Sequence, residues 1–281
     1  MVHNEGRIYS NAGIVQECNM LIQIRENKNA GKGGSVQRRI IDCVKPVSEG
    51  VHVADVRIGL GYTSVRLDNG SIGIAWTAQS PSRSCTHEAK AGTLVGKPAG
   101  EFLEMLANNH NYLARTLGLA TANALATALP RPEATVGDIL DIVSIHAGDH
   151  VVMVGYFGPL LSKLRATGCK LDILELKTDK PGTLSPEEGE APLAACSVAI
   201  ITATSIITGK LDALLASLGK PRAVVILGPS TFMYPRAFAE TPVTHLAGTR
   251  VRNVQAVEKI VSEGGGTMIL KQYLDFETIC L

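Results

Sequence analysis

A short apolar run that leads into a glycine-flanked turn constrains the fold of this chain more than any other feature. Val151–Val154 are consecutive apolar residues rich in Val, which is typical of a strand buried on both faces of a parallel sheet. Gly155-Tyr156-Phe157-Gly158 follows directly, and Pro159 suits the first turn of a helix, where its missing N–H costs nothing. Backbone N–H groups at such a turn favour an anion. The pattern therefore predicts a strand–turn–helix unit with a ligand at the turn, while a turn that binds nothing stays open as the alternative.

The chain beyond Pro130-Arg131-Pro132 alternates short apolar runs with helical patterns. Alternation of this kind indicates a parallel sheet with helices on both faces, and the two prolines mark a domain boundary. The expected helices are 136–143, 159–167, 211–218 and 254–263, and the expected strands are 151–154, 170–176, 197–202, 223–227, 243–246 and 267–270.

The preceding part has a different pattern. Apolar residues recur at helical spacing over 36–44, and Asn69-Gly70 between alternating apolar runs is a strong hairpin signal, because both turn positions need positive φ. Two further helices are expected over 98–107 and 109–129. We therefore predict an α/β protein with an extension over 1–35, a small α+β domain over 36–130 and an α/β domain over 131–281.

Composition limits the partners. The formal net charge is +1, so no global field recruits nucleic acid or a membrane surface. The first residues lack a signal-peptide pattern, and no apolar run approaches the length of a membrane span. We expect a cytoplasmic protein with a small-molecule ligand, no nucleic acid and no membrane partner. The composition leaves a homo-oligomer open.

Three turns rich in small residues follow expected strands, where open α/β sheets bind ligands. Their backbone N–H groups and hydroxyls are able to donate to a carboxylate, a phosphate or a ribose, although hydroxyls also cap helices. With Asn123 from the first domain, the candidate ligand residues are Gly155, Tyr156, Phe157, Gly158, Thr202, Thr204, Ser205, Gly228, Pro229, Ser230 and Thr231.

Glu175 is a further candidate because it lies 20 positions after Gly155. In dinucleotide-binding folds an acidic residue near this offset accepts from a ribose hydroxyl. The turn 155–158 lacks the three-glycine spacing of those folds, so a strand-end carboxylate in solvent is the alternative. Nucleotide binding without chemistry remains one hypothesis.

A metal site is the other open hypothesis. Cys85 and His87 place a thiol and an imidazole close together in the polar segment 79–92. No second ligand pair at short spacing accompanies them, so accidental proximity is the alternative. The cofactor is unknown, with a metal ion or a metal chelate as the candidates.

Several segments resemble an uncharacterised bacterial and archaeal family known as putative heavy-metal chelation proteins. In the second part of the chain these segments are 154–159, 201–212, 227–231 and 246–249, and in the first part they are 56–65, 92–99 and 117–124. The chain departs from the family's usual Thr-Gly-Thr-Thr turn at Thr202-Ala203-Thr204-Ser205, and it carries Lys210 nearby.

The resemblance implies a first domain like the N-terminal domain of enolase, a Rossmann-like second domain and an active site in the cleft between them. On this basis we expect a small anionic ligand or metal chelate in that cleft. Whether a reaction is catalysed stays open. A non-catalytic metal-handling protein and a nucleotide-binding module are the alternatives.

Overall fold

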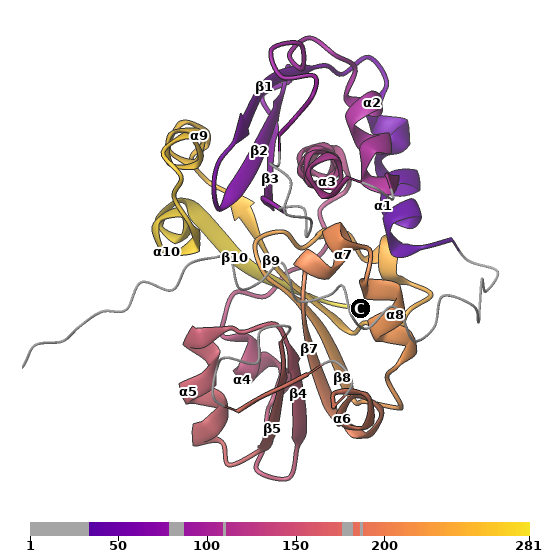
Figure 1. The fold of residues 1–281 in the computed structure, drawn as a ribbon, viewed down its shortest axis with the longest axis vertical. Helices are drawn as coiled ribbons and strands as arrows, with labels where there is room; N and C mark the ends of the chain where they lie inside the picture. The colour runs from indigo at the N-terminus through magenta and orange to yellow at the C-terminus, as the bar shows by residue number, and fades with distance from the viewer. Residues whose placement is uncertain (1–33, 79–86, 109–110, 176–181, 186–187) are drawn as a thin grey trace, which may run out of the picture.

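The computed structural model describes residues 34–78, 87–108, 111–175, 182–185 and 188–281. Its elements form two β-sheets with helices around them (Figure 1). The first part contains α1 (Val36–Val44), β1 (Val53–Ile58), β2 (Tyr62–Leu67), β3 (Ile72–Trp76), α2 (Ala99–Glu104) and α3 (Tyr112–Leu125). The second part contains α4 (Ile139–Val143), β4 (His150–Val154), α5 (Gly158–Ala166), β5 (Lys170–Leu174), β6 (Thr183–Leu184), α6 (Glu190–Ala195), β7 (Val198–Thr202), α7 (Thr204–Thr208), α8 (Leu211–Ala216), β8 (Ala223–Leu227), β9 (His245–Val251), α9 (Val254–Ser262), α10 (Thr267–Leu270) and β10 (Leu274–Cys280).

The small sheet is an antiparallel meander in the order β1-β2-β3. The predicted hairpin is confirmed, because β2 and β3 pair antiparallel and the Leu67 N–H donates to the Ser71 carbonyl at 2.8 Å. The expectation of positive φ at both turn positions is wrong, because only Gly70 has it, at 85°, and its N–H donates to the Leu67 carbonyl at 3.0 Å. Helix α3 covers one face of this sheet, where Gly73 leaves room for close backbone contact. Alternation along the strands sends the neighbouring side chains to the opposite face.

The large sheet has the order β10-β9-β8-β7-β4-β5-β6, and all its neighbouring strands are parallel except β10 and β9. Numbered from β4, the order is 3-2-1-4-5-6-7, which is the doubly wound Rossmann order with one antiparallel edge strand. The predicted α/β class with a mostly parallel sheet is therefore confirmed.

Alternate residues of the large sheet enter two different apolar clusters. Val151 and Met153 of β4 pack with α4 and α5, whereas Val152 and Val154 pack with the helices of the other face, α6, α7 and α8. The cluster that contains Val152 and Val154 continues into the apolar core around the small sheet. Burial on both faces explains why β4 is an unbroken apolar run.

The C-terminal segment differs from the prediction in two elements. The expected strand 267–270 is wrong, because these residues form α10, in which Leu270 is buried while Met268 and Ile269 are exposed. Three apolar residues after Thr267 do not distinguish a strand from one turn of helix. The sheet instead gains β10, which no prediction included.

Helix α4 begins later than expected, at Ile139, because Asp138 caps it by accepting from the Leu140 N–H at 3.0 Å.

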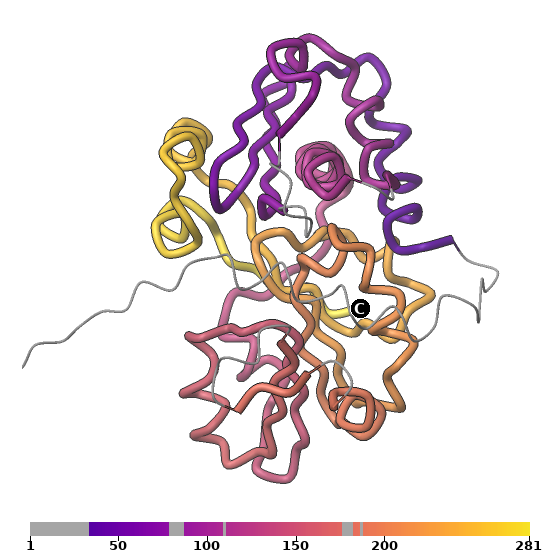
Figure 2. The backbone as a smooth tube through the Cα atoms, viewed as in Figure 1, coloured from indigo at the N-terminus to yellow at the C-terminus, as the bar shows by residue number. Residues whose placement is uncertain are grey.

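Segments distant in sequence lie side by side around the small sheet (Figure 2). The C-terminal helix α9 packs on β1 and β2, and Arg66 Nε donates to Glu258 Oε1 at 2.6 Å. The Tyr62 hydroxyl lies 2.8 Å from the Thr267 hydroxyl at the start of α10. None of the helices in the described ranges has the length and apolar character needed to cross a bilayer.

Candidate functional site

The candidate site lies where the strand order of the large sheet reverses. Chain connections run from β4 outwards through β5 and β6, and then return to β7 on the other side of β4. The carboxyl ends of β4 and β7 therefore diverge into separate turns, leaving the position at which doubly wound sheets bind ligands. The three predicted turns follow the adjacent strands β4, β7 and β8, so the structure brings them to one edge of the sheet.

The turn 155–158 connects β4 to α5. Gly155 is buried with a φ of 95°, and its N–H donates to the Leu174 carbonyl at 3.1 Å. Helix α5 begins at Gly158, and Pro159 lies in its first turn. Phe157, the residue before the helix, makes no side-chain hydrogen bond that caps it. Pro159 has no N–H and the Leu160 N–H donates to the Phe157 carbonyl at 2.9 Å, so the Gly158 N–H and the helix dipole, which makes this end positive, are what the first turn offers a ligand. The geometry suits an anionic group.

The turn 202–205 uses its hydroxyls internally. The Thr202 and Thr204 hydroxyls lie 3.0 Å apart, and Ser205 Oγ donates to the Thr202 carbonyl at 2.7 Å. All three residues are buried. These hydroxyls bond within the turn, but they do not cap α7 as the alternative expected, because Ala203 stands at its N-cap and makes no side-chain cap hydrogen bond.

The turn 228–231 ties the large sheet to the small one. Gly228 has a φ of 128°, and Thr231 Oγ1 donates to the Gly228 carbonyl at 2.7 Å. Ser230 Oγ accepts from the Trp76 N–H at 2.8 Å, at the end of β3. Pro229 is half-buried. The small sheet therefore abuts the carboxyl edge of the large sheet at this turn.

Glu175 and Asn123 occupy different surroundings. Glu175 is the first residue after β5, beside β4, and only 1% of its surface is exposed. Its burial contradicts the alternative of a strand-end carboxylate in solvent. Asn123 lies on α3, and its Nδ2 donates to the Ile74 carbonyl of β3 at 2.9 Å. The structure thus places Glu175 with the three turns and commits the Asn123 amide to the small sheet.

Of the two predicted metal ligands, the structure describes the imidazole but not the thiol. His87 is exposed, and Cys85 lies outside the described residues. Across the described ranges, no group of three or more His, Cys, Asp or Glu side chains is arranged to hold a metal ion. Burial raises the pKa of the Cys43 and Cys196 thiols, which keeps these two cysteines protonated and poor as metal ligands.

One contact of α7 was not predicted from the sequence. Side chains of α1 and α3 hydrogen-bond to the carboxyl end of α7. Gln37 Nε2 of α1 donates to the Ile206 carbonyl at 2.7 Å, and Arg115 Nη1 of α3 donates to the Ile207 carbonyl at 3.1 Å. Gly209 follows with a φ of 72°, and a Cβ there would lie 2.8 Å from Arg115 Nη1. Burial lowers the pKa of the Arg115 guanidinium. The only available signal was a single arginine within an apolar helix.

Two family models match the chain. Both are described as "Putative heavy-metal chelation", and they cover residues 41–126 and 138–280. An uncharacterized protein of Methanocaldococcus jannaschii is 24% identical over 245 residues, which span 84% of this chain and 93% of that protein.

Two solved structures of proteins with unknown function from the same family share the fold. The protein from Pyrococcus horikoshii gives a TM-score of 0.76 at 23% identity, covering 88% of this chain and 100% of the other. The protein from Desulfitobacterium hafniense gives a TM-score of 0.70 at 21% identity, covering 87% and 99%. Because the family model over 138–280 alone spans more than half of the chain, this protein belongs to the family described as "Putative heavy-metal chelation".

Proposed function

We propose that the carboxyl edge of the large sheet, between β4 and β7, binds a small anionic ligand or a metal chelate. The observation that carries the proposal is the strand order, which reverses at the turn 155–158 where an α-helix of nine residues begins. A helix start at a switch point is the anion site of doubly wound folds. Trp76 and Ser230 support placing the small sheet across from this edge, so the ligand would lie between the two sheets.

The charges around the edge favour a metal chelate over a simple anion. The start of α5 attracts negative charge, and the acidic residue Glu175 is buried at the end of the neighbouring strand β5. A metal chelate satisfies both, since its carboxylates would lie at the helix start and its metal ion would face Glu175. This chemistry agrees with the family's description.

The described side chains do not fit a metal held by the protein alone, because they form no cluster of three ligands. In our proposal the metal is therefore cargo that arrives with its own chelator. The hydroxyls of Thr202, Thr204, Ser205, Ser230 and Thr231 bond within the protein, and so do the N–H groups of Gly155, Ala203, Gly228 and Thr231. In our proposal the Gly158 N–H and the dipole of α5 therefore carry the binding. Asn123 would reach the ligand only through its Oδ1, since Nδ2 donates to Ile74. We also propose the prolines 130 and 132 as the domain boundary.

The test compares glycines at the two ends of α5. Gly155→Val at the proposed site should raise the Kd of zinc citrate at least about ten-fold in isothermal calorimetry, which corresponds to roughly 1.4 kcal/mol. Gly168→Val is the control for backbone strain, because Gly168 also has a positive φ, 75°, at the far end of the same helix, although Gly168 is exposed and Gly155 is buried. Both substitutions strain the backbone and should cost about 1–3 kcal/mol of stability, but only the first should weaken binding.

Zinc ions alone and citrate alone are the companion titrations. The proposal expects each to bind more weakly than the chelate. Equal affinity of the wild-type protein and the Gly155→Val variant would refute the placement of the site, and zinc ions that bind as tightly as the chelate would refute the ligand class.

A further inference from the structure

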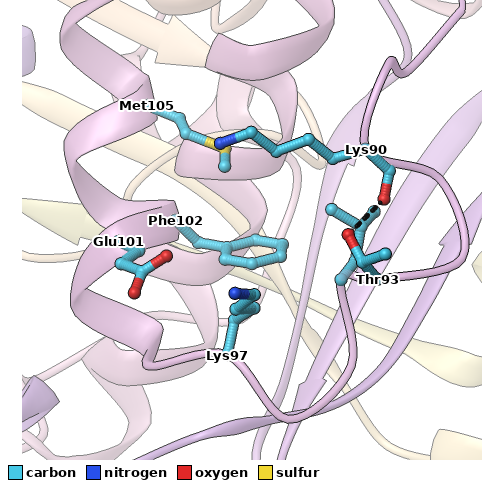
Figure 3. A pocket seen from close by; sticks show the side chains of 7 residues that line it. Lys90, Thr93, Lys97, Glu101, Phe102 and Met105 are labelled. Carbon is cyan, nitrogen blue, oxygen red and sulfur yellow. Dashed lines mark hydrogen bonds between the residues drawn. The ribbon is translucent and has the colours of Figure 1, made fainter.

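A pocket lies against α2, at the far end of the small sheet from the carboxyl edge of the large one. It has a volume of about 300 Å³ and is lined by Lys90, Thr93, Leu94, Lys97, Glu101, Phe102 and Met105 (Figure 3). The loop that lines the pocket hydrogen-bonds to Val53, and Val53 pairs with Leu67 at one end of the small sheet. Ser230 contacts Trp76, which pairs with Tyr62 at the other end of this sheet. The two sites are therefore distinct.

The wall of this pocket is held in place by backbone hydrogen bonds. The Gly96 N–H donates to the Val53 carbonyl at 2.8 Å, and the Val53 N–H donates to the Lys97 carbonyl at 2.9 Å. Thr93 Oγ1 donates to the Lys90 carbonyl at 2.9 Å. A loop fixed in this way requires little ordering when a ligand binds, so less of the interaction energy is lost.

The charges of the lining select the ligand. Lys90 and Lys97 are exposed and extend along opposite sides of the Phe102 ring in Figure 3, while Glu101 lies at the rim. Two ammonium groups repel a metal cation and attract an anion. The two ammonium groups outnumber the carboxylate of Glu101, so the lining as a whole attracts an anion.

The floor of the pocket is apolar. Leu94 and Phe102 are only 8% and 1% exposed, so the flexible, half-buried side chain of Met105 offers more of the accessible apolar contact than they do. Contact with these side chains rewards an apolar ligand body, and Met adapts its shape to the ligand. We propose that this pocket binds a small organic carboxylate with an apolar body, through Lys90 and Lys97.

Methyl NMR of the full-length protein labelled with ¹³C-methyl methionine tests the proposal, with 4-methylpentanoate as the probe. The Met105 signal, assigned with Met105→Leu, should shift saturably. Met153, which is fully buried in the large sheet, reports on the fold and should not shift. The amine 4-methylpentylamine has the same body with the opposite charge, and inorganic phosphate has charge without the body. Neither should produce the shift.

Lys90→Gln/Lys97→Gln should raise the Kd of 4-methylpentanoate at least about ten-fold, which corresponds to roughly 1.4 kcal/mol. Lys220→Gln/Lys259→Gln removes the same charge from two exposed lysines elsewhere and should leave the Kd unchanged. Glu101→Gln should tighten binding, because it removes the repulsion at the rim. Absence of a saturable shift, an equal shift with phosphate or the amine, or an unchanged Kd in Lys90→Gln/Lys97→Gln would each overturn the proposal. Since the probe contains no metal, these outcomes are independent of those for zinc citrate.

Discussion

Gly73→Ala is expected to lower the free energy of unfolding by about 3 kcal/mol, at the upper end of the usual cost of overpacking. A Cβ at this position would lie 2.1 Å from the Ala120 carbonyl oxygen and 2.4 Å from the Ala124 backbone nitrogen. Both atoms belong to the backbone of α3, so no change of rotamer relieves the clash. The helix must move away from β3, and the whole contact between α3 and the small sheet is weakened. Denaturant unfolding monitored by circular dichroism measures the effect.

Gly100→Ala is the matched control for this substitution. Gly100 lies in α2, where an added Cβ would meet only Ser48 Oγ at 3.6 Å, an ordinary contact. Alanine is favoured over glycine in a helix by about 1 kcal/mol, so this variant should be as stable as the wild-type protein or more stable. A Gly73→Ala variant with the stability of Gly100→Ala would show that α3 does not pack on β3 as closely as described.

Asp149→Asn should cost about 2 kcal/mol, less than for a fully buried pair because Arg222 is partly exposed. Asp149 lies at the amino edge of the large sheet, away from the candidate site. Its carboxylate accepts from Arg222 Nη2 at 2.6 Å, from Ser197 Oγ at 2.7 Å and from the His146 N–H at 2.9 Å. The substitution weakens the hydrogen bonds that hold the amino ends of β4, β7 and β8 together at that edge. Asp42→Asn, which removes an exposed carboxylate of α1, is the control and should change stability little.

The same carboxylate gives the protein a dependence on acid. In the folded state, hydrogen bonds hold the pKa of Asp149 below its usual value, and the hydrogen bond from Arg222 has the largest effect. A group with a depressed pKa contributes its stability above the unfolded pKa of about 3.9 and loses it as the pH falls further. The difference in unfolding free energy between the wild-type protein and Asp149→Asn should therefore be constant near neutral pH and shrink below about pH 4. A constant difference at all pH values would contradict this account.

The sequence predicted those features that depend on local pattern. The run Val151–Val154 indicated a doubly buried strand because burial on both faces demands apolar residues at every position. The three turns could be placed together because the carboxyl ends of parallel strands share an edge. Helix α10 was missed because the three apolar residues after Thr267 fit either structure. Strand β10 was missed because the alternation over 274–280 lies at the C-terminus, where fraying is expected.

The parts of the site that could not be predicted depend on residues far apart in the chain. Ser230 and Trp76 are separated by 154 positions, and Arg115 and Ile207 by 92. No local pattern indicates which hydroxyl accepts from a distant backbone N–H, or which carbonyls a buried guanidinium meets. The internal use of the hydroxyls of Thr202, Thr204 and Ser205 likewise follows from the geometry at the start of α7 rather than from composition.

Anomalous diffraction from crystals grown with zinc citrate tests the central proposal most directly. Because the zinc signal locates the metal without reference to any assumed site, the measurement distinguishes the carboxyl edge from all other surfaces. The account predicts a zinc peak between β4 and β7, beside the turn 155–158 and facing Glu175, with the citrate carboxylates at the start of α5. Zinc peaks confined to other places, such as His87, with none at this edge would contradict it.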